Sequence, residues 1–358
     1  MRLRILDFGQ VEALRSQAVY HGLAETVTDA SEPILSLASP ETPYVCVGLH
    51  QEIALEVDLT FCARHGLPVY RRHVGGGAVY LDRHQLFTHF VFPKARAPRR
   101  AAELYPLFIE PVLRTYRDFG IDAAYRPIND IHVSGRKIGG TGAASIGAAT
   151  VMVGSFMFDF DTATMAQCLR VPSEKFRDKL RQTLDDCMTT MVRELGTPPA
   201  REDLLARFFH HCREVLGLEP EPDSPTDAEW QAIEAAETAL LDSEFIEIQG
   251  RKLVRLGVKI AADTHLTEST VKAPGGLLRV HLLNRGGRVA DLMISGDLTC
   301  LPPDGLDRLA GALTGVALDE AALGDAAAQL LAAEGIETPG VAPTDFARAI
   351  IAAVEPAS

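Results

Sequence analysis

The stretch Arg71–Asp82, RRHVGGGAVYLD, constrains the chain most, because two arginines there are closely followed by three consecutive glycines. Glycine has no Cβ, so a ligand can approach its backbone closely, and successive N–H groups can surround an anion. Arginine adds charge where a phosphate or carboxylate would lie. Such glycine runs are also common in ordinary turns. The stretch therefore indicates an anion-binding loop only if a second cationic segment accompanies it.

A second cationic segment occupies residues 129–142, NDIHVSGRKIGGTG, where a Ser-Gly turn is followed by Arg136 and Lys137. It is not a Walker A loop, because Ile138 stands where that motif needs serine or threonine. Nor is it a dinucleotide fingerprint, because the third glycine after Gly140 and Gly142 is missing. Two cationic, glycine-rich segments together are suited to holding a nucleotide phosphate against another anion.

Together these segments resemble the lipoate–protein ligase branch of the biotin and lipoyl attachment enzymes. Pro43–Gln51 and Gly66–Tyr70, which lead into Arg71, fit the same pattern in the same order. Val271–Leu278 and Ile294–Leu298 resemble the accessory domain of these ligases. The chain has Met-Val-Gly-Ser at 152–155 where the family often has a His-His-Gly-like segment. The resemblance covers most of the chain and is that of a diverged branch.

The resemblance implies a ligase that joins lipoate or octanoate to the α-phosphate of ATP, with Mg²⁺, and transfers the acyl group to a lysine of a lipoyl carrier domain. Carboxylate and phosphate repel each other, so a fixed cation between them is the main electrostatic need, and Lys137 is the candidate catalytic residue. The predicted ATP and adenylate site comprises Arg72, Gly75, Gly76, Gly77, Ala78, Asn129, Asp130 and Lys137, with Asp130 also a candidate Mg²⁺ ligand. The predicted acyl pocket comprises Arg71, His73, Val74, Gly140, Val153 and Gly154.

Two other functions stay open at this point. An octanoyl or lipoyl transferase of the same superfamily would use a cysteine thiolate without ATP, and Cys168 follows Lys137 at a suitable spacing. The surrounding sequence favours the end of an amphipathic helix, where a small buried thiol is the commoner outcome. A non-catalytic binder of carrier domains is the third hypothesis, against which the lysine and the glycine triplet argue.

Composition limits the class of protein. The net charge of −13 disfavours nucleic-acid binding, which usually needs a basic surface. No apolar run reaches the roughly 18–20 residues of a membrane span, and Asp7 interrupts any secretory leader. The six cysteines include no Cys-x-x-Cys pair. We expect a cytoplasmic monomer without a membrane or nucleic-acid partner.

We predict an α+β fold with a catalytic domain at 1–245, built on a mixed sheet packed by helices, and a small α+β accessory domain at 255–358. Spacing predicts helices at Val11–Thr26, Phe61–His65, Ala102–Phe119, Thr162–Leu169, Arg201–Leu216 and Glu229–Leu241, and strands at Pro33–Leu37, Tyr44–Gly48, Val69–Arg72, Ala78–Leu81, Leu86–Phe92 and Val151–Phe160. Leu218–Asp227 reads as a surface excursion, and two strands and two helices are expected after Arg255. His210, His211 and Cys212 suggest a metal cluster, but adjacent helical residues point about 100° apart, which disfavours joint ligation.

Overall fold

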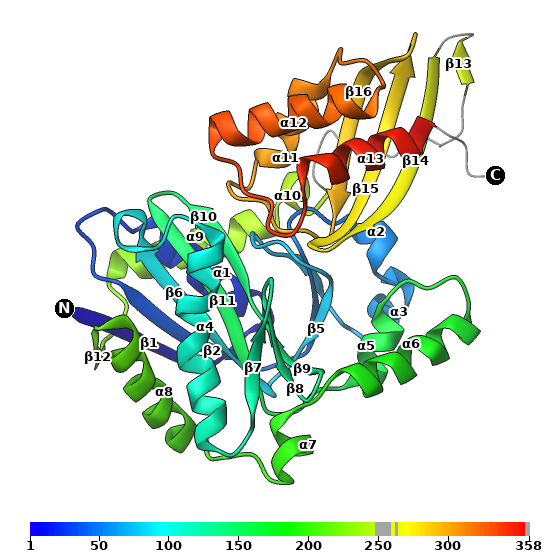
Figure 1. The fold of residues 1–358 in the computed structure, drawn as a ribbon. Coiled ribbons are helices and arrows are strands. Elements are labelled where there is room, and N and C mark those ends of the chain that lie inside the picture. Colours follow the sequence, from blue (N-terminus) through cyan, green and yellow to red (C-terminus); the bar gives the residue numbers. More distant parts are fainter. Residues whose placement is uncertain (248–258, 262–263, 355–358) are drawn as a thin grey trace. The chain divides into compact units, whose positions relative to one another are not determined.

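The computed structural model describes residues 1–247, 259–261 and 264–354 (Figure 1). Contacts divide the chain into two compact units. Unit 1 comprises Met1–Val47, Ala54–Arg72 and Ala78–Asp242, and unit 2 comprises Gly48–Ile53, His73–Gly77 and Ser243–Ser358. Two short segments of the N-terminal half therefore belong to unit 2. The limits of 1–245 and 255–358 remain a prediction, and residue 255 lies outside the described residues.

Unit 1 contains a mixed six-stranded sheet in the order β10-β11-β6-β2-β1-β12. These strands are β10 (Gly142–Ile146), β11 (Ala149–Met157), β6 (Gln85–Pro93), β2 (Ile34–Pro40), β1 (Arg2–Val11) and β12 (Glu219–Pro222). The β1 strand runs parallel to β2 and β12, and the other pairs are antiparallel. The predicted mixed sheet is confirmed.

The expectation of a surface excursion at Leu218–Asp227 is wrong, because Glu219–Pro222 forms the edge strand β12 beside β1. Pro220 and Pro222 lack an N–H group, and this composition argued against a strand. At a sheet edge only one side of the strand must pair, so alternating prolines are tolerated there.

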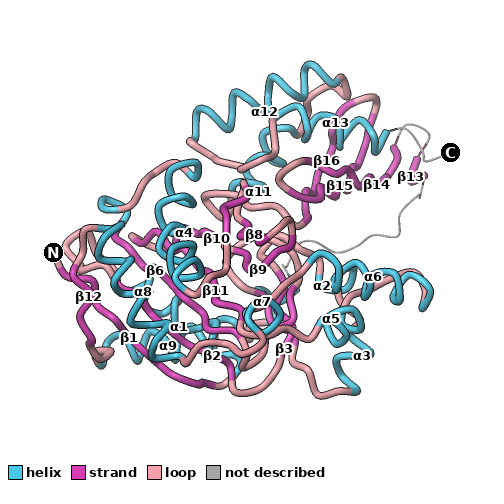
Figure 2. Tube along the Cα trace, turned by 60° about the horizontal axis from the view of Figure 1, so that its bottom comes forward, coloured by secondary structure: helices cyan, strands magenta, loops and turns pink. Residues whose placement is uncertain are grey.

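The strand β6 lies among the helices of unit 1 (Figure 2), and its side chains point alternately to its two faces. The Phe90 ring lies 4.9 Å from Phe108 of α4 (Ala101–Asp118) and 6.1 Å from Phe208 of α8 (Arg201–Leu216). The next residue back, His89, faces Tyr20 of α1 (Ala13–Glu25) at 5.1 Å. The helix α9 (Asp227–Leu240) packs against α1. The sheet is thus covered on both faces, which explains why all of β6 is buried.

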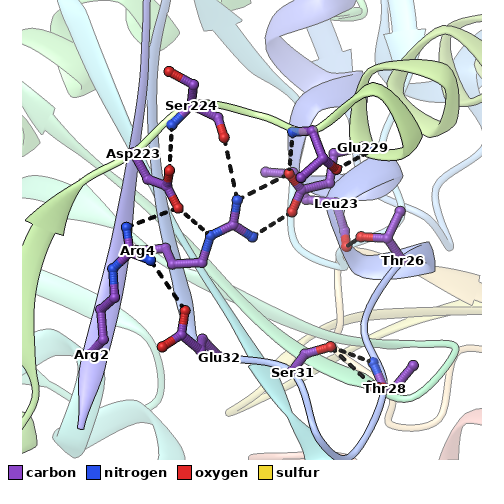
Figure 3. A network of polar contacts seen from close by, with 11 residues as sticks. Arg2, Arg4, Leu23, Thr26, Thr28, Ser31, Glu32, Asp223, Ser224 and Glu229 are labelled. Carbon is purple, nitrogen blue, oxygen red and sulfur yellow. Dashed lines mark hydrogen bonds and ion pairs between the residues drawn. The ribbon is translucent and has the colours of Figure 1, made fainter.

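A polar network joins β1 to the start of α9 (Figure 3). Two nitrogens of the Arg4 guanidinium donate to the Glu229 carboxylate at 2.6 and 3.1 Å, and its Nε donates to Asp223 at 2.7 Å. Glu229 also accepts the Thr226 N–H at 2.7 Å and completes a capping box with that residue. One buried carboxylate therefore caps α9 and fixes it to the first strand.

We expect Glu229→Gln to destabilise the chain by about 1–2 kcal/mol at pH 7, because the charge-assisted bonds to Arg4 are weakened. Burial raises the pKa of Glu229, but the bonds from Arg4 and Thr226 outweigh it and hold the pKa below its ordinary value. This stabilisation is full above the unfolded-state pKa of about 4.3 and is lost as pH falls through the folded-state value. Urea unfolding at pH 7 and at pH 3–4 should show the difference from the parent shrinking in acid. The exposed Glu234→Gln change on the same helix is the control, and an equal loss there would contradict the assignment.

Smaller elements of unit 1 surround the sheet. One three-stranded sheet is formed by β3 (Tyr44–Val47), β4 (Val69–Arg71) and β5 (Val79–Leu81), and another by β7 (Ala123–Arg126), β8 (Asp130–Val133) and β9 (Arg136–Gly140). The smaller helices are α3 (Leu59–Arg64), α5 (Thr162–Cys168), α6 (Glu174–Cys187) and α7 (Met191–Leu195), with a 3₁₀ turn at Lys94–Arg96. The short helix α2 (Ile53–Glu56) begins at the last residue of the segment 48–53, which belongs to unit 2. The helix α6 was not predicted from the sequence; its apolar residues Phe176, Leu180 and Leu184 are few among charged residues, and only Arg177 in it is buried.

Unit 2 is an antiparallel sheet with helices packed on it. The strands are β13 (Lys259–Ala261), β14 (Thr264–Ala273), β15 (Gly276–Arg285) and β16 (Arg288–Gly296), and the helices are α10 (Ser243–Glu247), α11 (Gly305–Leu313), α12 (Glu320–Glu334) and α13 (Pro343–Val354). Leu278, Val280 and Leu282 alternate along β15 into a core shared with Phe346 and Ile350. The predicted α+β class is confirmed. The expectation of two strands and two helices is wrong, since four strands and three helices lie between 259 and 354 among the described residues.

Candidate functional site

The β8–β9 hairpin presents Lys137 through a tight turn and a bulge. Ser134 and Gly135 both have positive φ, 49° and 82°, as a two-residue hairpin turn of the primed type requires. Lys137 pairs with His132, whereas Gly139 pairs with Ile131, so Ile138 is an extra, fully buried residue in β9. The bulge places Lys137 opposite His132, on the strand face that Asp130 shares.

On this face the ammonium group of Lys137 has a carboxylate partner and an open approach. Its Nζ lies 2.7 Å from Asp130 Oδ1, and His132 Nε2 lies 3.6 Å from the other oxygen of Asp130. Gly140 pairs with Asp130 in the register, and a Cβ placed there would be 3.0 Å from Lys137 Nζ. Any side chain at position 140 would therefore displace the end of the Lys137 side chain. The Lys137 side chain is 39% exposed, so a ligand can reach it.

The main chain of Lys137 is fixed by the segment between α6 and α7. Thr189 donates its N–H to the Lys137 carbonyl at 2.8 Å, and Met188 forms an isolated parallel bridge with Lys137. Arg136 binds Glu194 of α7 at 2.8 Å. These contacts hold the hairpin so that only the lysine side chain is free to adjust.

A small cavity lies beside this hairpin within unit 1. Its lining residues are Thr88 and Phe90 of β6, Phe108 and Val112 of α4, Ile131 of β8, Thr141, and Met152, Val153, Gly154 and Ser155 of β11. Ile131 and Thr141 directly follow Asp130 and Gly140 in the chain, and strand alternation turns the Ile131 side chain to the face opposite Asp130. Asn129 Nδ2 donates to the Thr141 carbonyl at 2.7 Å and closes the base of the hairpin. The structure thus brings together six predicted site residues: Asn129, Asp130, Lys137, Gly140, Val153 and Gly154.

The predicted arginines lie in or beside β4 of the same unit. Arg71 is the largest side chain with almost no exposure, at 1%. Arg72 donates its N–H to Val47 at 3.0 Å and its Nη1 to the Cys46 carbonyl at 3.2 Å. Ala78 stands one residue before β5. Arg72 therefore helps to hold this region against β3, and Arg71 is enclosed in β4.

The glycine triplet belongs to unit 2, where close backbone packing explains two of its members. A Cβ at Gly75 would lie 2.5 Å from the Leu298 carbonyl oxygen. Gly76 has a φ of +94° and donates its N–H to that oxygen at 3.4 Å. Gly77 has room, since the nearest atom to its Cβ would be 3.9 Å away. In the same segment Val74 is buried and His73 stacks on Phe245 at 4.3 Å. A side chain at Gly77, unlike one at Gly76, would test ligand approach without straining unit 2.

The cysteines differ sharply in access. Cys168 is fully buried, and burial next to Cys62 raises the pKa of its thiol to about 12. At pH 7 roughly one such thiol in 10⁵ would be ionised. Cys187 is the exposed cysteine, and it immediately precedes Met188, which bridges to Lys137. The sequence spacing suggested Cys168 as the candidate nucleophile. Cys187 comes near Lys137 because the next residue, Met188, forms a β-bridge with that lysine.

Residues 12–213, more than half of the chain, match the family model of the lipoyl protein ligase A/B catalytic domain. The chain belongs to this family. The match includes the hairpin with Lys137, the cavity lining and the arginines, and the predicted recognition is confirmed.

Named relatives of this family member fall into two activities. It is 25% identical to octanoyltransferase LipM of Kyrpidia tusciae, over 60% of this chain and 86% of that protein. It is 29% identical to lipoate-protein ligase LplJ of Bacillus subtilis, over 53% of this chain and 57% of that protein. The chain thus belongs to the group formed by lipoate–protein ligases and octanoyltransferases. The choice between these two activities depends on the residues of the candidate site.

The fold of this family member extends beyond the matched domain. The crystal structure of P. falciparum LipL1 in complex with lipoate is similar at a TM-score of 0.67 and 16% identity, covering 92% of this chain and 94% of that one. The likeness confirms the predicted fold of a ligase-like domain with a C-terminal extension. Within the described ranges, we find no helix with the length and apolar character needed to cross a membrane.

Proposed function

We propose that the chain is an ATP-dependent ligase that activates lipoate or octanoate as an acyl-adenylate and then transfers the acyl group to a lysine of a lipoyl carrier domain. One observation carries the proposal: the Lys137 ammonium is 39% exposed beside Asp130, while the Cys168 thiol is fully buried and burial raises its pKa. A ligase needs the cation, and a thiol transferase would need the thiolate.

In the first step a carboxylate oxygen attacks the α-phosphorus of ATP, the bond to the β-phosphate oxygen breaks, and pyrophosphate leaves. Both reacting groups are anionic, so their approach is opposed until a cation lies between them. Lys137 meets this need, because its compact ammonium has three donors and can bind the carboxylate and the phosphate together. Asp130, 2.7 Å from Nζ, holds the ammonium in place before the substrates bind.

The acyl chain would bind at this cavity, whose volume of about 10 Å³ has to widen to admit it. Phe90, Phe108 and Val112 give it an apolar wall, and a Cβ at Gly154 would lie 3.2 Å from Thr141 Cγ2. A medium-length chain or a dithiolane ring that enters there would lie against Ile131 and Thr141, which are next to Asp130 and Gly140 in the sequence, so its carboxylate would lie near the hairpin. Apolar burial contributes affinity, and the single cation sets the orientation.

Asp130 also fits the demands of Mg²⁺ with ATP. Mg²⁺ takes oxygen ligands and commonly uses one or two protein carboxylates plus substrate phosphates. Asp130 is the carboxylate on the lysine face, and it is partly exposed. Mg²⁺ bound with ATP would neutralise phosphate charge, and the role of Asp130 would be to hold it near Lys137.

In the second step the carrier lysine attacks the acyl carbon and AMP leaves. The acceptor is the lipoyl domain lysine that the sequence resemblance implies. The proposal is tested by pyrophosphate release from ATP with lipoate, octanoate and biotin in turn, followed by mass spectrometry of a lipoyl domain. We expect release with lipoate or octanoate and one acylated lysine. Acylation from an octanoyl-carrier donor without ATP would contradict the proposal.

The second candidate is a thiol-dependent octanoyltransferase, favoured by the similarity to LipM and by Cys187 near the lysine. In this route the thiolate takes the acyl group from a carrier thioester, and the carrier thiol leaves. Asp185 and Asp186 precede Cys187, and a reactive thiolate is normally placed among cations. This neighbourhood favours the ligase.

We expect Cys168→Ser and Cys187→Ser each to retain ATP-dependent acylation within about threefold of the parent, since neither thiol reacts in the proposed scheme. The assay is mass spectrometry of the acylated lipoyl domain, with and without ATP. Loss of transfer by about 10³-fold in either variant, together with ATP-independent transfer by the parent, would establish the thiol route. ATP binding without pyrophosphate release for any acid would instead indicate a non-catalytic binder.

A further inference from the structure

We infer that the helix α8 carries a divalent metal site formed by His210, His211 and Glu214, with Zn²⁺ as the best-matched ion. The side-chain ligand atoms of these three residues all lie within 4.8 Å of one another. Two imidazoles and a carboxylate form a donor set that zinc accepts, with a water as the fourth ligand. This site lies apart from the residues assigned to the ligase chemistry.

Helix geometry explains the convergence that the sequence argued against. Successive residues are about 100° apart, so His210 and His211 diverge, but Glu214 falls about 40° from the first and about 60° from the second. It therefore lies between them, one turn further along α8. His210 Nε2 is 3.3 Å from one Glu214 oxygen, and His211 Nδ1 is 3.7 Å from the other. Zinc bonds of about 2.0–2.1 Å at tetrahedral angles place ligand atoms about 3.3–3.4 Å apart. Cys212 is fully buried and is not the third ligand.

The hydrogen bonding of His211 leaves one of its ring nitrogens available to bind a metal ion. Its residue exposure is 7%, and its Nε2 lies 2.9 Å from Asp118 Oδ2, so that nitrogen carries the proton and donates it. The other nitrogen, Nδ1, is buried and makes no hydrogen bond within the described part of the chain. Its lone pair faces the Glu214 carboxylate, an unfavourable pairing unless a cation lies between them. A carboxylate that orients a histidine through its second nitrogen is the usual support of a zinc ligand.

The other two ligands can close on an ion at low structural cost. The side chains of His210 and Glu214 are 55% and 47% exposed. Arg114 approaches Glu214 at 3.4 Å, but it also has Glu110 as a closer partner at 2.8 Å. If Glu214 bound a metal instead of Arg114, the arginine would therefore keep Glu110 as its ion-pair partner.

The test is Zn²⁺ binding to the full-length chain after metal removal, measured by competition with a chromophoric chelator. The measurements use a Cys187→Ser background with reductant, so that the exposed thiol does not bind zinc. We expect one Zn²⁺ per chain, and Co²⁺ in its place should give the visible absorption of a four-coordinate site. His210→Ala and Glu214→Gln should each weaken binding at least tenfold, and Asp118→Asn about 10–100-fold.

Matched controls keep the test specific. Glu202→Gln removes an exposed acid from the same helix, and His65→Ala removes an exposed histidine elsewhere; both should leave zinc affinity unchanged. Thermal unfolding of each variant without metal shows whether it is folded. Binding weaker than about 100 μM in the parent, or equal binding in all variants, would overturn the site.

Discussion

Replacing Lys137 with alanine is expected to lower acyl-adenylate formation by at least about 10²–10³-fold, equivalent to roughly 3–4 kcal/mol of barrier. The loss follows because two anions must meet without the ammonium that offsets their repulsion. The fold should persist, since Ile138 and the carbonyl bond from Thr189 anchor β9 without the lysine side chain. Pyrophosphate release under saturating ATP and octanoate is the measurement.

Lys94→Ala is the matched control for this change. That lysine is exposed in the same unit, and its Nζ donates to the Gly147 carbonyl at 2.8 Å. Its loss should leave the rate within about twofold. If Lys137→Ala stays within a few-fold of the parent, the lysine is not the activating cation.

Adding one methyl group at Gly140 is expected to cost about 10²-fold in rate while leaving the fold intact. The new Cβ would lie 3.0 Å from Lys137 Nζ and 3.1 Å from Cε. These atoms end a flexible side chain, so the lysine can move aside and the backbone need not. A displacement of about 1 Å in a positioning group is enough for a loss of this size.

The neighbouring glycine provides the control for Gly140→Ala. A Cβ at Gly139 would meet Ser155 O at 3.5 Å, which is an ordinary contact, so Gly139→Ala should keep the rate within a few-fold. Both variants should unfold within about 2 °C of the parent. Equal rates for the two variants would show that the position of the ammonium group does not limit the reaction.

Local pattern was sufficient to predict much of unit 1. Helical spacing predicted α4, and an apolar run predicted the fully buried β6. The Ser-Gly turn before Lys137 was predicted, but the strands β8 and β9 that it joins were not. Local sequence patterns did not predict the elements whose structure depends on contacts with distant parts of the chain. The prolines of β12 are acceptable only at a sheet edge, and the one buried residue of α6, Arg177, binds Asp58 far away in the sequence.

The candidate site shows the same limit. The Lys137–Asp130 pair is local to one hairpin, so spacing could suggest it. The packing of Gly75 and Gly76 on Leu298 joins residues far apart in the sequence, and no local motif announces that contact. Likewise the approach of Cys187 to Lys137 depends on the bridge at Met188. The residue types in the sequence suggested the chemistry of the site. Only the three-dimensional structure shows which residues contact one another there.

The most direct test of the proposed function is a crystal structure of the chain with octanoate and a non-hydrolysable ATP analogue. The activation scheme predicts Lys137 Nζ within about 3 Å of both a carboxylate oxygen and an α-phosphate oxygen. It also predicts that the acyl chain lies against Phe90 and Val153. An ammonium that stays on Asp130, more than about 6 Å from the α-phosphate and without a water between them, would contradict the scheme.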